Sequence, residues 1–267
     1  KKMAQFKTVE DVKQAFLVRS NGSDSIMNHA GIRYSDIDKH AHIVERLLET
    51  DYNTVSGYTF TEMIWYLLLA EIITFGSGSK VATNEIRNTI KSGNIAYQVT
   101  KPYNYIGFTI CKFLADTFIR FILFLIVAVI LGFIFAGPIE NFNLISLIPA
   151  IPVFFFAILI TGMVKILISL SAFWVEDSQP FQMVYSKIVL IFGVLFPLEM
   201  FPHIIQTIIK FTPVYGVSYG PAKLIIDFNS SILTNVLLSQ VITIIVVAIL
   251  LKIVYGRGVK KLNVNGG

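Results

Sequence analysis

The sequence predicts an all-α integral membrane protein. Of its 267 residues, 54% are hydrophobic and only 15% are charged, and the mean hydropathy is +0.67. Soluble domains are about a quarter charged. The apolar residues form runs long enough to cross a bilayer as helices, which takes about 20 residues. Transmembrane strands would show about ten residues of strict alternation, and no segment has this pattern.

Five apolar segments predict about five transmembrane helices. They cover residues 60–76, 106–136, 144–174, 181–201 and 232–255. Four of them reach the length of a helical crossing, whereas the first is marginal at its outer end. The second and third can tilt in the bilayer or continue as helix beyond it. We therefore expect a transmembrane domain over residues 51–267 and a polar N-terminal segment over residues 1–50.

The charges between these segments predict the orientation. Residues 77–104 carry four basic residues against Glu85 alone, and the chain after residue 250 carries four basic residues and no acid. Short cytoplasmic loops are rich in Lys and Arg, so both stretches should be cytoplasmic and residues 137–143 and 202–231 outside. The acidic loop VEDSQP disagrees, but acids count little in this rule. The sequence thus predicts a multi-pass plasma-membrane protein with a cytoplasmic C-terminus.

Residues 80–97 predict a short amphipathic helix at the inner membrane interface. Apolar Val81, Ile86 and Ile90 alternate with polar residues at helical spacing. Gly93 is a plausible helix end, and Pro102 prevents helix until the next span begins. The alternative is an ordinary interfacial loop with basic anchors, which anionic lipid headgroups would attract.

Several motifs, in order, resemble permease subunits of type-2 ABC exporters, in their small bacterial and archaeal branch. EMIWYLL is followed by EI..TI.SG.IAY...KPYNY, then by FWVEDSQPF, LFPLEMFP and FTPVYGVSYGPAKLI, and the chain ends in YGRGVKKLNVNGG. The resemblance covers about residues 52–267. Family members normally have six spans, whereas residues 1–48 hold no run able to cross. A replaced start, an unusual N-terminal helical domain or a partner that supplies the span would each explain this.

The resemblance implies that residues 80–97 are a coupling helix that docks on a cytoplasmic ABC ATPase subunit. Its predicted contacts are polar Glu85, Arg87 and Lys91 and apolar Ile86, Ile90 and Ile95. The resemblance also implies a second permease chain, in a homo- or heterodimer, surrounded by membrane lipid. It implies as well that residues 202–231 are a helical hairpin in the outer leaflet, with a break marked by Pro213, Gly216, Gly220 and Pro221.

The implied function is ATP-driven export of an amphipathic or lipid-like substrate, which the sequence does not identify. The chain itself is not expected to be an enzyme, because it lacks a Walker A motif and the catalytic Ser, His and Cys motifs. ATP and Mg²⁺ would bind the partner subunit, and no directly bound cofactor, catalytic group or metal is expected here. His40 and His42 form only a lone HxH pair. The net charge of +5 reflects membrane orientation rather than nucleic-acid binding.

Charged residues inside the apolar segments are the remaining candidate sites, because such groups are costly in lipid and are usually buried or functional. They are Glu71, Lys112, Asp116, Arg120 and Lys165. Lys112, Asp116 and Arg120 lie four residues apart, so they share one helix face as a paired anchor or a substrate site. Glu71 and Lys165 are predicted to lie at a comparable depth in the membrane, which suggests that they pair.

The alternative function is an ion-coupled secondary transporter or channel, with Glu71, Asp116 and Lys165 as its relay. A lipid-modifying membrane enzyme is a weaker alternative.

Overall fold

The structure is a computed structural model of the chain. It describes residues 57–77, 80–139, 147–175 and 177–265, and within these residues every regular element is a helix. Residues 64–267 form one compact unit, and residues 57–63 are described on their own. The N-terminal segment 1–50 and the His40–His42 pair lie outside the described residues, so their predictions stay untested.

Three helices in the described part are long and apolar enough to cross a membrane. They are α7 (Tyr105–Phe135), α8 (Leu147–Leu170) with the 3₁₀ turn Ser171–Phe173, and α12 (Ser230–Asn265). Each corresponds to one predicted apolar segment. The chain therefore fits the predicted all-α membrane class. α4 (Phe60–Gly76) has 17 residues and corresponds to the segment that was marginal in length.

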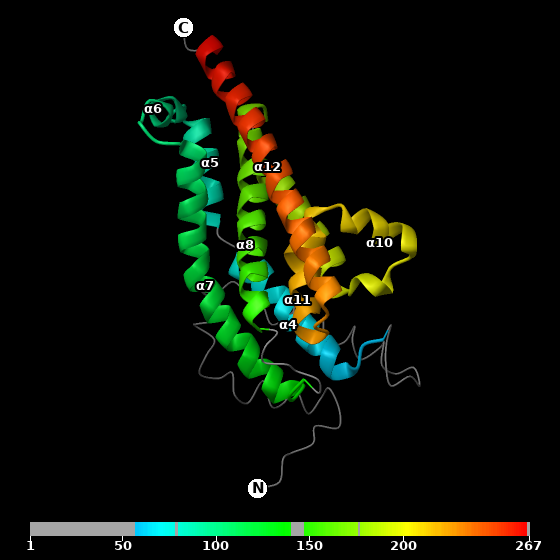
Figure 1. The fold of residues 1–267 in the computed structure, drawn as a ribbon. Coiled ribbons are helices and arrows are strands. Elements are labelled where there is room, and N and C mark those ends of the chain that lie inside the picture. The colour runs from blue at the N-terminus through cyan, green and yellow to red at the C-terminus, as the bar shows by residue number, and fades with distance from the viewer. Residues whose placement is uncertain (1–56, 78–79, 140–146, 176, 266–267) are drawn as a thin grey trace. The chain divides into compact units, whose positions relative to one another are not determined.

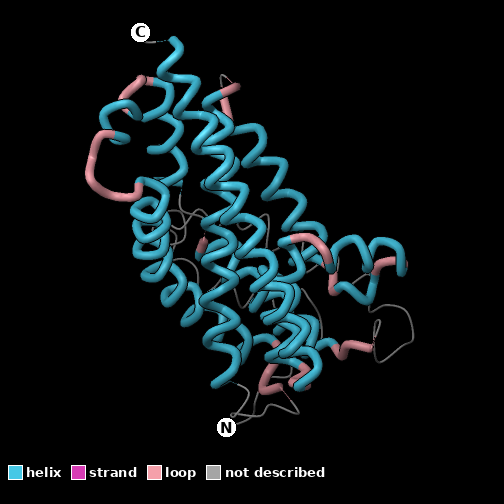
Figure 2. The backbone as a smooth tube through the Cα atoms, turned by 45° about the horizontal axis from the view of Figure 1, so that its top comes forward, coloured by secondary structure: helices cyan, strands magenta, loops and turns pink. Residues whose placement is uncertain are grey.

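The three long helices run side by side, with α8 packed against both α7 and α12 (Figures 1 and 2). In the most apolar stretch of α8, 67% of the residues are buried, compared with 11% of those in α7 and 22% of those in α12. Gly162 lets α7 approach α8, because a Cβ at this position would lie 2.5 Å from the ring of Phe113. α8 is thus the core of the bundle, and α7 and α12 present long apolar faces outward.

The start of α4 is capped by its own side chains. The Thr59 backbone N–H donates to Glu62 Oε2 at 2.8 Å, and the Glu62 N–H donates back to Thr59 Oγ1 at 3.3 Å, which is a capping box. Further along the helix, Trp65 Nε1 donates to the Gly137 carbonyl at 2.9 Å. This bond fixes α4 to the chain just beyond α7.

The predicted fourth span, 181–201, is not one continuous helix. α9 (Gln179–Val189) widens into a π-helix at Leu190–Leu195, and the chain is extended at Phe196 before the 3₁₀ turn Leu198–Met200. Pro197 explains the end, because a proline disfavours helix at the residue before it and offers no N–H to the preceding turn. The result is a shorter apolar helix, Gln179–Leu195.

The predicted hairpin region contains the amphipathic helix α10 (His203–Lys210), as expected. The predicted break at Pro213–Pro221 is wrong. There the π-helix Tyr215–Tyr219 runs directly into α11 (Gly220–Ile226). The two glycines serve close packing instead, because a Cβ would lie 3.0 Å from Gln240 at Gly216 and 2.8 Å from Val236 at Gly220.

Candidate functional site

The predicted amphipathic helix is present as α5 (Lys80–Lys91), followed by the one-turn helix α6 (Ile95–Val99). α5 packs on α8, on α7 and on the 3₁₀ turn after α8. Gly93, with a φ of +73°, separates the two short helices in a backbone conformation that favours glycine. The sequence therefore located both the helix and its end.

The apolar face of α5 is turned into this chain, not outward. Ile86 and Ile90 are 1% and 7% exposed, and Ile95 of α6 is fully buried. An amphipathic helix buries its apolar stripe against the nearest apolar surface, which here is the permease bundle itself. In this structure the three isoleucines are buried within the chain, and their role as ATPase contacts stays a prediction.

Two ion pairs join α5 to neighbouring elements. Glu85 pairs with Lys112 of α7. Arg87 Nη1 lies 3.2 Å from Asp177 Oδ1, in the connection between α8 and α9, and it donates to Gln179 Oε1 at the start of α9 at 2.6 Å. A hydrogen bond from the Gln179 backbone N–H, with the nearby positive charges of Lys91 and Arg87, holds the pKa of the Asp177 carboxyl below its usual value.

Sequence reasoning missed the Arg87–Asp177 contact, although a signal was present. The acids of VEDSQP were unexpected on the cytoplasmic side, and a basic helix was predicted on the same side. The structure shows that one of these acids, Asp177, neutralises Arg87.

Basic and aromatic side chains form part of the accessible surface of this region. Lys91 is exposed, and Tyr97 is 70% exposed. Lys101 Nζ lies 5.1 Å from the centroid of the Tyr97 ring and 5.9 Å from that of Tyr103, as in cation–π contacts. We call Lys91, Tyr97, Val99, Lys101 and Tyr103 the α5–α6 surface. It lies beside the C-terminal part of α12, which α6 contacts (Figure 1).

The predicted intramembrane charges do not form one group. On α7, Asp116 pairs with Arg120 at 3.4 Å, whereas Lys112 turns to Glu85. Lys165 Nζ donates to the Ser77 carbonyl at 2.5 Å, at the end of α4. The relay of the alternative transporter function therefore lacks a direct contact between Asp116 and Lys165.

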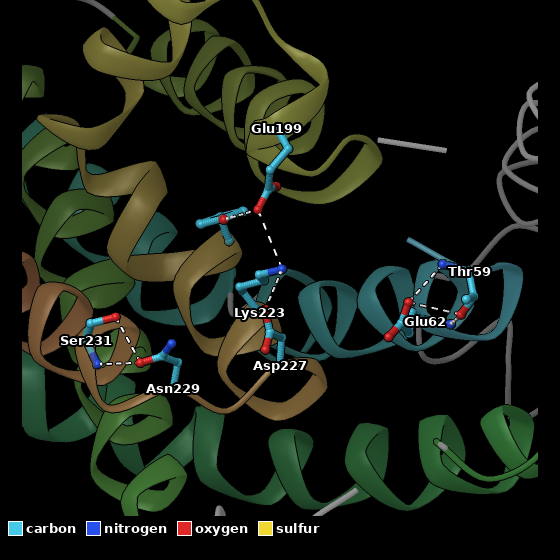
Figure 3. A network of polar contacts seen from close by, with 8 residues as sticks. Thr59, Glu62, Glu199, Lys223, Asp227, Asn229 and Ser231 are labelled. Carbon is cyan, nitrogen blue, oxygen red and sulfur yellow. Dashed lines mark hydrogen bonds and ion pairs between the residues drawn. The ribbon is translucent and has the colours of Figure 1, made fainter. Parts of the chain in front are cut away.

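A second polar cluster lies where α11 meets the turn after Pro197 (Figure 3). Lys223 Nζ lies 3.6 Å from Glu199 Oε1 and 3.2 Å from Asp227 Oδ2, and the Tyr219 hydroxyl donates to Glu199 Oε1 at 2.6 Å. The Lys223 side chain is only 15% exposed. The four-residue spacing of Tyr219, Lys223 and Asp227 could have predicted this cluster, since it places all three on one helix face.

A comparison with protein families decides the identity of the chain. The sequence model of one family, described as ABC-2 family transporter protein, matches residues 43–266. The chain belongs to this family. It is therefore a multi-pass membrane protein and an ABC transport permease, and membership implies association with ABC ATPase subunits. No curated protein is significantly similar to the chain.

Proposed function

We propose that this permease is the transmembrane subunit of an ATP-driven exporter in the plasma membrane, which moves an amphipathic or lipid-like substrate out of the cell. ATP and Mg²⁺ would bind a separate cytoplasmic ABC ATPase, and a second permease chain would complete the pathway. The observation that carries the proposal is the attachment of α5, a short helix fixed to α7, to α8 and to the connection between α8 and α9.

The charge distribution supports a cytoplasmic location for α5 and for the C-terminal part of α12. Lys91 and Lys101 lie in or after α5, and Lys252, Arg257, Lys260 and Lys261 lie on the last part of α12. These two regions are neighbours, since α6 contacts α12 and the Tyr105 ring stacks on Tyr255 at 5.8 Å. Basic residues gather on the cytoplasmic side of membrane proteins.

We assign the ATPase contact to the α5–α6 surface, where Lys91, Tyr97 and Tyr103 are exposed. It offers two lysines and two exposed tyrosines, and tyrosine is a residue type enriched in binding hot spots. Glu85 and Arg87 would serve differently, by joining α5 to the spans. Force applied at the surface would then move α5 as one body and pass to α7 and α8.

The outer apolar faces of α7 and α12 support a membrane-embedded dimer. Both helices leave most of their apolar stretch uncovered within the chain. Lipid and a second permease are the two surroundings that suit such a face, because neither requires polar side chains. We place the second chain against these helices.

The test is co-purification with the ABC ATPase subunit that we expect to be encoded beside this permease. We compare the wild type with Lys91→Glu/Tyr97→Ala, which alters only exposed side chains. Wild type should retain the ATPase, and the double variant should lose most of it while still inserting in the membrane. Ile204→Ala, which changes an exposed residue of α10 instead, is the matched control and should retain it.

Two results would contradict the proposal in different ways. Equal ATPase retention by the wild type and the double variant would reject the α5–α6 surface but keep the exporter. If no ATPase is retained even by the wild type, the ATP-driven exporter loses its main support. An ion-coupled transporter would then become the leading explanation.

A further inference from the structure

A small cavity lies between the end of α4, the middle of α8, α9 and the π-helix Tyr215–Tyr219. Its volume is about 40 Å³. Most of the surface that faces the cavity is apolar, but six of its eight lining residues carry polar groups: Thr74, Ser77, Thr161, Lys165, Tyr185 and Ser186. None of the eight carries a carboxylate.

Lys165 gives this cavity a positive charge that the protein leaves unbalanced. Its ammonium has three N–H donors, and among the described residues its one partner is the neutral Ser77 carbonyl. No carboxylate of the described residues lies within ion-pair distance of it. An ammonium away from water is costly unless a counter-charge accompanies it.

Tyr185 supplies a further donor. Its hydroxyl oxygen is buried and has no hydrogen-bond partner in the described part of the chain. Buried hydroxyl groups are normally paired, so an unpaired one calls for an explanation. Both residues line the cavity, and in the described part of the chain neither the two remaining N–H groups of Lys165 nor the O–H of Tyr185 has a partner.

The other hydroxyls do not supply the missing acceptor charge. Thr74, Thr161 and Ser186 donate to backbone carbonyls of their own helices, and Ser77 donates to Ile73. They are neutral, and each hydroxyl can rotate to donate to a guest. The lining therefore favours a negatively charged guest.

We propose that this cavity binds a small monovalent anion, of halide size, against Lys165 and Tyr185. The volume accommodates about three water-sized groups, which suits one chloride ion and excludes a complete phosphate ester. The anion neutralises Lys165 and joins α4, α8 and α9 where they meet. The site does not depend on the proposed export function, because every group that forms it belongs to this chain.

The test is the thermal stability of the purified full-length permease in sodium chloride or in sodium gluconate at equal ionic strength. A ligand that binds only the folded state stabilises it in a saturable way. Chloride and bromide should raise the unfolding midpoint above its value in gluconate. Tyr185→Phe should weaken the apparent chloride affinity several-fold, and Lys165→Met should abolish the effect.

Lys187→Met is the control, since it removes an exposed lysine from the same helix as Tyr185 and should keep the chloride effect. If Lys165→Met does not fold, anomalous diffraction from bromide-soaked wild-type crystals replaces it, with a peak expected beside Lys165 Nζ. Equal midpoints in chloride and gluconate would overturn the proposal and leave water in the cavity. Loss of the chloride effect on adding phosphatidylglycerol would also overturn it, in favour of a lipid headgroup.

Discussion

α5 and the stretch from Leu190 to Ile226 are both built from short helices packed against long ones, but different forces hold them. α5 is fixed by buried isoleucines, whereas its Glu85–Lys112 ion pair is exposed, with the side chains of Lys112 and Glu85 41% and 49% accessible. In the second region, buried side chains from other helices hydrogen-bond to the backbone. Removing a single polar side chain should therefore destabilise the fold more in the stretch from Leu190 to Ile226 than at α5.

Prolines explain why the second region needs side-chain donors. The Gly193 carbonyl lies four residues before Pro197, which has no N–H to offer, and it accepts from the Tyr66 hydroxyl at 2.8 Å. In a π-helix a carbonyl accepts from the N–H five residues later, which for Gly216 is Pro221, and proline has no N–H. The Gly216 carbonyl accepts from Gln240 Nε2 at 2.7 Å instead. Helices α4 and α12 thus satisfy the acceptors that two prolines leave open.

The largest effect is expected from Ile86→Ala on α5. The Ile86 side chain is 1% exposed, and truncation of a buried isoleucine costs about 2–4 kcal/mol through lost burial and the cavity left behind. The free energy of unfolding can be measured by SDS titration in mixed micelles. Ile204→Ala, at a residue that is 77% exposed, should change it little. Equal costs for the two variants would mean that α5 is not held by its apolar face.

A smaller effect is expected from Gln240→Leu. This change removes the bonds to the Gly216 and Val153 carbonyls, and it leaves the buried Gly216 carbonyl without this side-chain donor. Gln240 Oε1 itself has no partner among the described residues, so its removal offsets part of the loss. We expect a destabilisation of about 1–2 kcal/mol in the same SDS titration.

Asn235→Leu is the matched control for that variant, because it also replaces an amide on α12 but at an exposed position. A Gln240→Leu permease at least as stable as the wild type would show that the amide is not needed to satisfy the open carbonyls. The contrast between the two regions would then disappear.

The sequence predicted more of the first region than of the second. The apolar spacing of Val81, Ile86 and Ile90 predicted α5 correctly, because a local pattern determines a local helix. It could not show which surface would cover that face, since this depends on the packing of α7 and α8. The glycines at 216 and 220 were interpreted as a break for a related reason. Their role is to admit Gln240 and Val236, which are distant in sequence.

The smallest effect is expected from Asp177→Asn, which removes the carboxylate that pairs with Arg87 of α5. The pKa of Asp177 lies below its usual value because the Gln179 N–H and nearby positive charges favour the ionised form. The ionised carboxylate therefore stabilises the fold above the unfolded pKa of about 3.9, and this contribution is lost as the pH falls through the lower folded pKa. Asp177→Asn should lower the thermal midpoint slightly at pH 7, by less than Gln240→Leu.

The difference in midpoint between Asp177→Asn and the wild type should disappear in acid. The small difference for Ile204→Ala, which changes no charge, should stay constant with pH. A midpoint difference for Asp177→Asn that is unchanged in acid would show that Arg87 does not depend on the charge of Asp177, and α5 would then be held by its buried isoleucines and the Glu85–Lys112 pair.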